Sequence, residues 1–141
     1  MKSGAVLAFD FGERRIGVAV GEMRLRIAHP LETIDAAASE PRFARIAALI
    51  EEWRPVLLVV GLPLALDGTE HRLTALARKF SQRLHGRFGL EVRLVDERLS
   101  SVEAQHAARD NGLDGRETKK HLDSLAAKLI LETFFDDNAL A

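Results

Sequence analysis

The chain has 141 residues, of which 47% are hydrophobic and 29% charged, and it contains no cysteine. This balance predicts one globular domain, 1–141, and excludes a disulfide framework and any thiolate metal site or nucleophile. The net charge is −1, so contact with nucleic acid would rely on local basic patches. The chain lacks both the roughly 18-residue apolar run of a membrane span and a signal-peptide pattern, so we expect a cytoplasmic protein without membrane contact.

The first third of the chain predicts three strands joined by short connections. Apolar runs begin at Val6, Ile16 and Leu25, and the third run continues past Pro30 towards Ile34. Short connections between successive strands favour antiparallel hairpins. We therefore expect three antiparallel strands at the start of the chain.

The middle of the chain predicts two helices, each followed by a strand. Apolar residues at helical spacing lie between Pro41 and Pro55 and again over residues 69–85. The segments "VLLVVGLP" and "EVRLVDE", which follow them, are typical of strands. The pattern predicts an α/β fold with a five-stranded mixed sheet, in which three antiparallel strands precede two βα units and helices cover both faces.

The C-terminal part predicts two further helices separated by a loop. Ser100 and Glu103 have the spacing of a capping box, which favours a helix start. The polar, glycine-containing segment 109–121 predicts a loop. A last helix is expected from about residue 121 to residue 135.

Asp10 is a carboxylate at the end of the first apolar strand, next to a turn at Gly12. A charge in an apolar strand is costly unless it is paired or binds a cation. An aspartate beside a turn can also accept hydrogen bonds from the backbone that follows. On this residue alone both interpretations stay open.

Asp96 and Glu97 close the fifth predicted strand. Ligands of open α/β sheets bind outside the carboxyl ends of the parallel strands, which favours a functional role. Because side chains alternate along a strand, only one of the two can face the same way as Asp10. Solvated charge at a strand end is the other interpretation.

Asp123 lies on the last predicted helix, beside a stripe that we expect to be buried: Leu122, Leu125, Ala126 and Leu129. Its own side of the helix carries alanines, which would allow a close approach to the sheet. Taken alone, Asp123 fits a helix N-cap better than a site residue.

Three acids from distant parts of the chain could converge at one end of the sheet. Mg²⁺ and Mn²⁺ prefer a few carboxylates and keep waters for substrate phosphate. Two such ions could activate a water and stabilise the leaving oxygen of a phosphodiester. The acids therefore point to a divalent-metal site.

Four segments together resemble the motifs of the RuvX (YqgF) family in order and spacing: "AFDFGERRIGVAVG", "VVGLPLALDG", "LVDERLSSVEA" and "LDSLAAKLIL". The resemblance runs from about residue 6 to residue 135. It implies an RNase H-like fold and a nuclease that resolves Holliday junctions or processes the 5′ end of pre-16S rRNA. It also implies Asp10, Glu97 and Asp123 as the catalytic, metal-binding acids, with Asp96 as second choice and Mg²⁺ or Mn²⁺ as cofactor.

Two positions depart from the family's usual motifs. Ala65 stands where the family usually has Asn in its "GLPLNxDG" motif, so this chain cannot make any polar interaction that the Asn side chain would provide. "DERLSS" replaces "DERLTT" and keeps the hydroxyls. Neither change affects the three acids.

Basic residues near the motifs are candidate nucleic-acid contacts: Arg14, Arg15, Arg98, Arg116, Lys119 and Lys120. A solvated hairpin tip explains the first two equally well, and a solvated loop explains those after residue 115. The segment "GLPLALDG" could form the rim of the site or only a connecting turn.

Two other functions remain possible. A nuclease fold can be retained as a nucleic-acid-binding module with weak or no catalysis. The turn "DFGERRIGVAV" also resembles the phosphate-binding turn of actin-like ATPases, but those enzymes need two such domains. Junction resolution would favour a two-fold homodimer, because two strands are cut symmetrically. The motifs do not decide between a DNA junction and precursor rRNA.

Overall fold

The computed structural model describes residues 4–99 and 116–137. Its five-stranded sheet has the order β3-β2-β1-β4-β5. The strands are β1 (Ala5–Phe11), β2 (Arg15–Glu22), β3 (Ile27–Asp35), β4 (Leu57–Leu62) and β5 (Val92–Asp96). β1, β2 and β3 pair antiparallel, whereas β4 is parallel to β1 and β5 is parallel to β4. The predicted five-stranded mixed sheet is confirmed.

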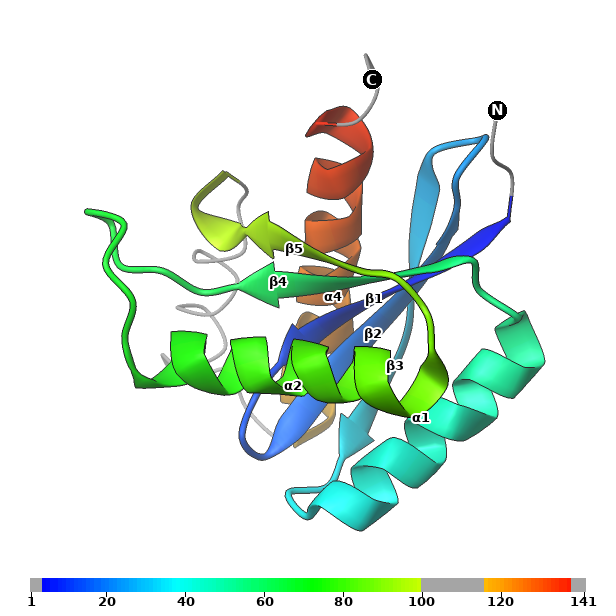
Figure 1. Cartoon of the computed structure of the whole chain (residues 1–141), viewed down its shortest axis with the longest axis horizontal. Helices are drawn as coiled ribbons and strands as arrows, with labels where there is room; N and C mark the ends of the chain where they lie inside the picture. Colours follow the sequence, from blue (N-terminus) through cyan, green and yellow to red (C-terminus); the bar gives the residue numbers. More distant parts are fainter. Residues whose placement is uncertain (1–3, 100–115, 138–141) are drawn as a thin grey trace.

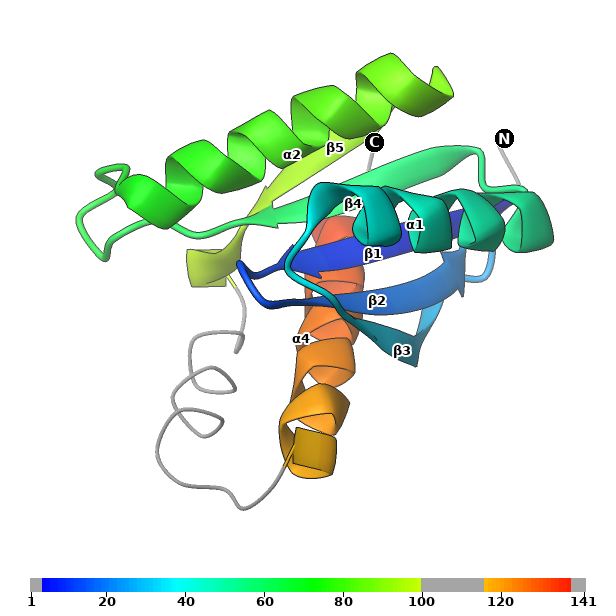
Figure 2. The same ribbon diagram turned by 90° about the horizontal axis from the view of Figure 1, so that it is seen from below.

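Helices cover both faces of the sheet, as predicted (Figures 1 and 2). α1 (Ser39–Trp53) and α2 (Arg72–Phe88) lie on one face, and α4 (Arg116–Asp137) crosses the other. A single 3₁₀ turn, η1 (Glu97–Leu99), follows β5. Within the described ranges, no helix has the length and apolar character needed to traverse a membrane.

Alternation along β1 sends its side chains to two separate cores. Leu7 and Phe9 pack beneath α1 and α2, whereas Val6 and Ala8 pack against α4. The same alternation directs the side chain of Asp10 to the α4 face. Asp10 thus faces α4, the helix that carries Asp123.

The last helix is longer than predicted, and this corrects the loop prediction for residues 116–121. α4 begins at Arg116, so Lys119 and Lys120 are helical. The segment reads "RETKK" and has no apolar residue to reveal a helical period, although Arg, Glu and Lys are good helix formers. The predicted helix and capping box at Ser100 lie outside the described residues.

The buried face of α4 also differs from the prediction. Leu122, Leu125 and Leu129 are only partly buried, whereas the core contains Ala126, Ala127, Ile130, Leu131, Phe134 and Phe135. The sequence offers apolar residues on both sides of this helix, so periodicity alone did not decide between them. The small side chains of Ala126 and Ala127 let this face lie closest to the sheet.

Candidate active site

Asp10 lies between two glycines on the neighbouring strands. Gly17 of β2 is its direct partner in the antiparallel register. On the other side, Phe9 pairs with Val60 in β4, so Gly61 comes next to Asp10 one residue further along. Asp10 is 4% exposed and belongs to the strand itself and not to the turn that follows it. Both neighbours lack side chains, and this leaves room above the sheet on the α4 face.

Asp123 occupies the space above Gly17. A Cβ at Gly17 would lie 2.0 Å from the carbonyl oxygen of Asp123, so the backbone of α4 touches the sheet here. The Asp123 side chain is 2% exposed and accepts a 2.8 Å hydrogen bond at Oδ2 from Nε of Arg15. Asp123 lies well inside α4, so the N-cap interpretation is wrong. The Arg15 charge offsets part of the cost of burying this carboxylate.

Glu97 occupies the space above Gly61. Its Oε1 would lie 2.6 Å from a Cβ at Gly61, and the Glu97 side chain is 3% exposed. A Cβ at Gly61 would also meet Ile130 of α4, so Gly61 faces α4 and Glu97, the residue directly after β5, lies on the face that Asp10 shares. The structure thus brings Asp10, Glu97 and Asp123 to one end of the sheet, on one face.

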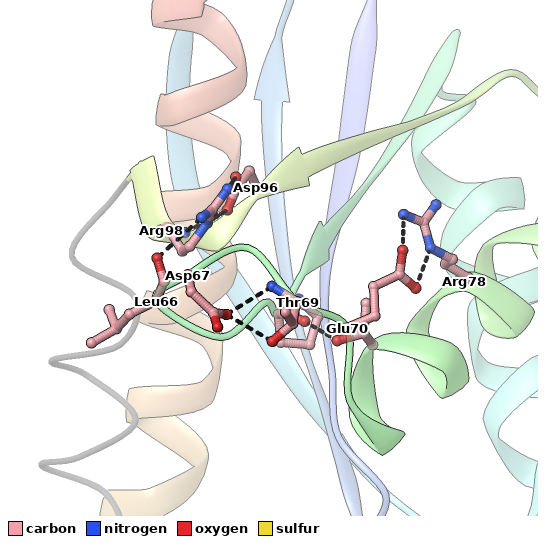
Figure 3. A network of polar contacts seen from close by, with 9 residues as sticks. Leu66, Asp67, Thr69, Glu70, Arg78, Asp96 and Arg98 are labelled. Carbon is pink, nitrogen blue, oxygen red and sulfur yellow. Dashed lines mark hydrogen bonds and ion pairs between the residues drawn. The ribbon is translucent and has the colours of Figure 1, made fainter.

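Asp96 is engaged elsewhere. Its carboxylate accepts hydrogen bonds from the backbone N–H and the guanidinium of Arg98, with a 2.7 Å contact from Nη2 to Oδ2 (Figure 3). These contacts lower the pKa of the Asp96 carboxyl. Arg98 Nη1 also donates to the Leu66 carbonyl oxygen at 3.3 Å, which ties the end of β5 to the loop after β4. Asp96 therefore has a structural partner, and the structure favours Glu97 for the site.

The remaining basic candidates fall into different surroundings. Arg14 is exposed at the β1–β2 turn, where Gly12 lets the chain pass close to the Arg15 carbonyl oxygen. Lys120 makes a 3.6 Å ion pair with Asp35, and Lys119 is half-buried on the same turn of α4. Arg116 begins α4, and its side chain lies outside the described part of the structure. Arg15 and Lys120 lie close together, because Arg15 pairs with Asp35 in the register of β2 and β3 and Lys120 ion-pairs with the same Asp35.

The three acids fit a divalent metal by their chemistry but are not preassembled around one. Carboxylate oxygens are the ligands that Mg²⁺ and Mn²⁺ prefer, and buried carboxylates of like charge favour a cation between them. In residues 4–99 and 116–137, however, no three histidine or acidic side chains are grouped closely enough to hold an ion. The side chains would have to turn towards one another to bind one.

Comparison with protein-family models gives a match over residues 4–137 to RuvX, described as a Holliday junction resolvase. The chain belongs to the RuvX family. Proteins similar to this RuvX chain include one from Methylobacillus flagellatus, 62% identical over 94% of this chain and 91% of its own length. Another, from Chromobacterium violaceum, is 57% identical over 96% of this chain and 99% of its own. Both carry the name "Putative pre-16S rRNA nuclease".

Solved structures support the fold of this RuvX chain. Thermus thermophilus RuvC, determined with a Holliday junction substrate, matches with a TM-score of 0.58 at 15% identity. The match covers 97% of this chain and 96% of the RuvC chain. A second structure of Thermus thermophilus RuvC gives a TM-score of 0.56. At this level of identity the similarity concerns the fold alone, which is RNase H-like.

Sequence reasoning missed the two glycines that make room for the acids. Gly17 and Gly61 each lie on a strand at a position facing α4, where an apolar side chain would otherwise be expected. A glycine inside a strand pattern is a recognised sign of close approach by another part of the chain. That signal was present in "RIGVAV" and "LVVGLP", although it does not reveal which residue approaches.

Proposed function

We propose that this chain is a metal-dependent endonuclease that hydrolyses phosphodiester bonds in structured nucleic acid in the cytoplasm. The observation that carries the proposal is the gathering of three buried carboxylates, Asp10, Glu97 and Asp123, above two glycines at one end of the sheet. Membership of a family described as Holliday junction resolvases supports a nuclease. The names of the relatives favour pre-16S rRNA as the first substrate to test, and the family resemblance implies its 5′ end.

The three acids would hold two Mg²⁺ or Mn²⁺ ions, and Arg15 would hold Asp123 in position. Bound ions of this kind neutralise charge on the phosphate and lower the pKa of water. Hydrolysis forms a bond from a water oxygen to phosphorus and breaks one phosphorus–oxygen ester bond, leaving a phosphate on one product end and a hydroxyl on the other. Arg14, exposed at the turn after Asp10, would contact a phosphate of the bound strand.

The test is cleavage of an end-labelled panel in Mg²⁺ or Mn²⁺. The panel holds a precursor-rRNA leader, a four-way DNA junction, duplex DNA, and single-stranded DNA and RNA. Cleavage of the leader by the wild type, absent in the Asp10→Asn variant, is the expected result. Tight binding without cleavage of any member by the folded protein would instead favour a binding module.

The oligomeric state provides a second criterion for the substrate. Symmetric cutting of a junction favours a two-fold dimer, whereas trimming of an rRNA end does not require one. We propose to measure the oligomeric state by light scattering. A dimer that also cleaves the four-way junction would identify DNA junctions as the substrate. A monomer that cleaves the leader assigns the chain to rRNA.

The neighbouring acids Glu97 and Asp96 form a matched pair for testing the site. Glu97→Gln is expected to lower the cleavage rate by about a hundredfold or more, because a buried site carboxylate loses its charge. Asp96→Asn is expected to stay within a few-fold of the wild type, since Asp96 is engaged with Arg98. Single-turnover rates at saturating protein measure both. The reverse order of effects would assign the site to Asp96.

Gly61→Ala tests whether the glycine gap is needed for the placement of Glu97. The new Cβ would lie 2.6 Å from Glu97 Oε1 and 2.4 Å from Ile130 Cδ1, both at the ends of flexible side chains. We expect a stability loss of about 1–3 kcal/mol from overpacking and a cleavage rate at least about tenfold lower.

A second substitution distinguishes the effect of the new alanine methyl group on Glu97 from its effect on Ile130. Ile130→Val removes Cδ1, so the double variant Gly61→Ala/Ile130→Val should regain thermal stability and not cleavage. If cleavage returns together with stability, displacement of Glu97 is not the cause of the loss.

A further inference from the structure

A second polar site lies on the opposite face of the sheet from the acids. It is a cavity of about 240 Å³ between α1 and α2, beside the β1–β2 turn. Phe43 and Phe80 belong to the core beneath it, and Phe11 at the end of β1 and Glu13 of the following turn line one side. Four cationic side chains line it: Arg42, Arg72, Lys79 and Arg83. We call these lining residues the α1–α2 pocket.

The charge of the α1–α2 pocket is strongly unbalanced. Among the described residues that line it, Glu13 is the one carboxylate against four cations, and it is already engaged in an ion pair with Arg72. The chain as a whole has a net charge of −1, so this excess is local. A pocket with such an imbalance favours an anionic ligand.

Arg42 differs from the other cations of the pocket because its side chain is buried and held in place by the fold. Its side chain is 6% exposed, and its guanidinium lies 5.4 Å from the centre of the Phe11 ring. It donates to the carbonyl oxygens of Gly12 and Ala36, so its hydrogen bonds go to neutral acceptors. Burying a cation is costly, and the nearby Glu13 carboxylate, which also pairs with Arg72, offsets only part of that cost, so an anion in the pocket would offset more.

α2 presents the other cations along one side. Arg72, Lys79 and Arg83 are spaced seven and four residues apart, which places them on one helical face. Arg83 reaches across to α1, where Nη1 lies 3.5 Å from Ser39 Oγ. This spacing was readable in the sequence, but only the packing of α2 beside α1 shows that Arg42 completes the set.

We propose that the α1–α2 pocket binds a phosphate group, carried by a nucleic-acid strand that passes over the β1–β2 turn from the acidic site. Arginine makes bidentate hydrogen bonds to phosphate oxygens, and lysine contributes a localised positive charge. The pocket lining includes Phe11, the last residue of β1 and the residue after Asp10, so one nucleic-acid strand can contact both faces at this end of the sheet. The identity of the strand rests on the proposed function, whereas the phosphate chemistry does not.

The test measures binding and not cleavage. Fluorescence anisotropy of a labelled single-stranded RNA would be recorded in the Asp10→Asn background, with Lys79→Gln/Arg83→Gln compared with Arg78→Gln/Lys128→Gln. Both pairs remove one lysine and one arginine from helix surfaces, but Arg78 and Lys128 lie outside the pocket lining. The pocket pair is expected to raise Kd about tenfold and to reduce the salt slope by about 0.7 for each phosphate that the protein no longer neutralises.

Each outcome decides a different point. Equal weakening by both pairs, or no weakening by either, overturns the pocket. Competition by inorganic phosphate and by a nucleoside monophosphate distinguishes the source. The nucleoside monophosphate and unlabelled RNA are compared as competitors of the labelled RNA. If both displace it at similar concentrations, the pocket binds the free nucleotide as well as a strand, and the proposal that its ligand is a nucleic-acid strand is overturned. Failure of the wild-type protein to cleave any member of the panel would overturn the proposed function and leave the binding result intact.

Discussion

Replacing Asp10 by Asn is expected to lower the cleavage rate by about a thousandfold or more while the fold is kept. Asn has nearly the shape of Asp but lacks the charge, and metal-centred stabilisation of a phosphoryl transition state contributes several kcal/mol, at about 1.4 kcal/mol per factor of ten. Asp10 is 4% exposed and faces two other acids across glycine positions. The measurement is the single-turnover rate on the cleaved member of the panel.

Stability should not fall in the same variant. Asn has nearly the shape of Asp, so thermal unfolding of Asp10→Asn without added metal is expected near the wild-type temperature. Asp136→Asn, at the exposed end of α4, is the matched control and should retain full activity. Wild-type cleavage by a clean preparation of Asp10→Asn would remove Asp10 from the site.

Gly17→Ala is expected to have the largest effect on stability, about 4 kcal/mol or more, because the new methyl group meets backbone and not a movable side chain. Its Cβ would lie 2.0 Å from the Asp123 carbonyl oxygen and 3.1 Å from the Ser124 nitrogen. α4 would have to move away from β2, and the packing of Ala126 and Ala127 on the sheet would open. Thermal and urea unfolding measure the loss, expected as roughly 10 °C or more.

Gly86→Ala is the control for the same chemical change. Gly86 lies within α2, and a Cβ there has nothing within 4 Å. Alanine is favoured over glycine in a helix by about 1 kcal/mol, so this variant should be slightly more stable than the wild type. If Gly17→Ala unfolds at the same temperature as the wild type, the close contact between α4 and β2 is not a feature of the folded protein.

The order of strands and helices was predictable because it depends on local patterns. Continuous apolar runs such as "VLLVVG" predict buried strands, and Phe43, Ile46 and Trp53 show helical spacing that the structure confirms as α1. Antiparallel pairing of the first strands follows from their short connections. The predicted start of α4 was wrong, because the polar first turn of this helix has no hydrophobic period that would reveal it.

The candidate site was only partly predictable. Asp10 was open between a turn aspartate and a site residue, and Asp123 by itself favoured an N-cap, which the structure excludes. Alternation established that Asp96 and Glu97 face opposite ways, but not which of them faces Asp10. The family resemblance named the three acids without a physical reason for their meeting.

The sequence by itself determined the strands, most of the helices, the covering of both sheet faces by helices and the identity of the candidate acids. Only the tertiary structure decided that Glu97 shares the face of Asp10, that Asp123 lies on the buried side of α4, and that Arg42 joins the basic face of α2. The reason is physical. Local patterns depend on residues a few positions apart, whereas the glycine gaps and the α1–α2 pocket exist only where segments distant in sequence pack against each other.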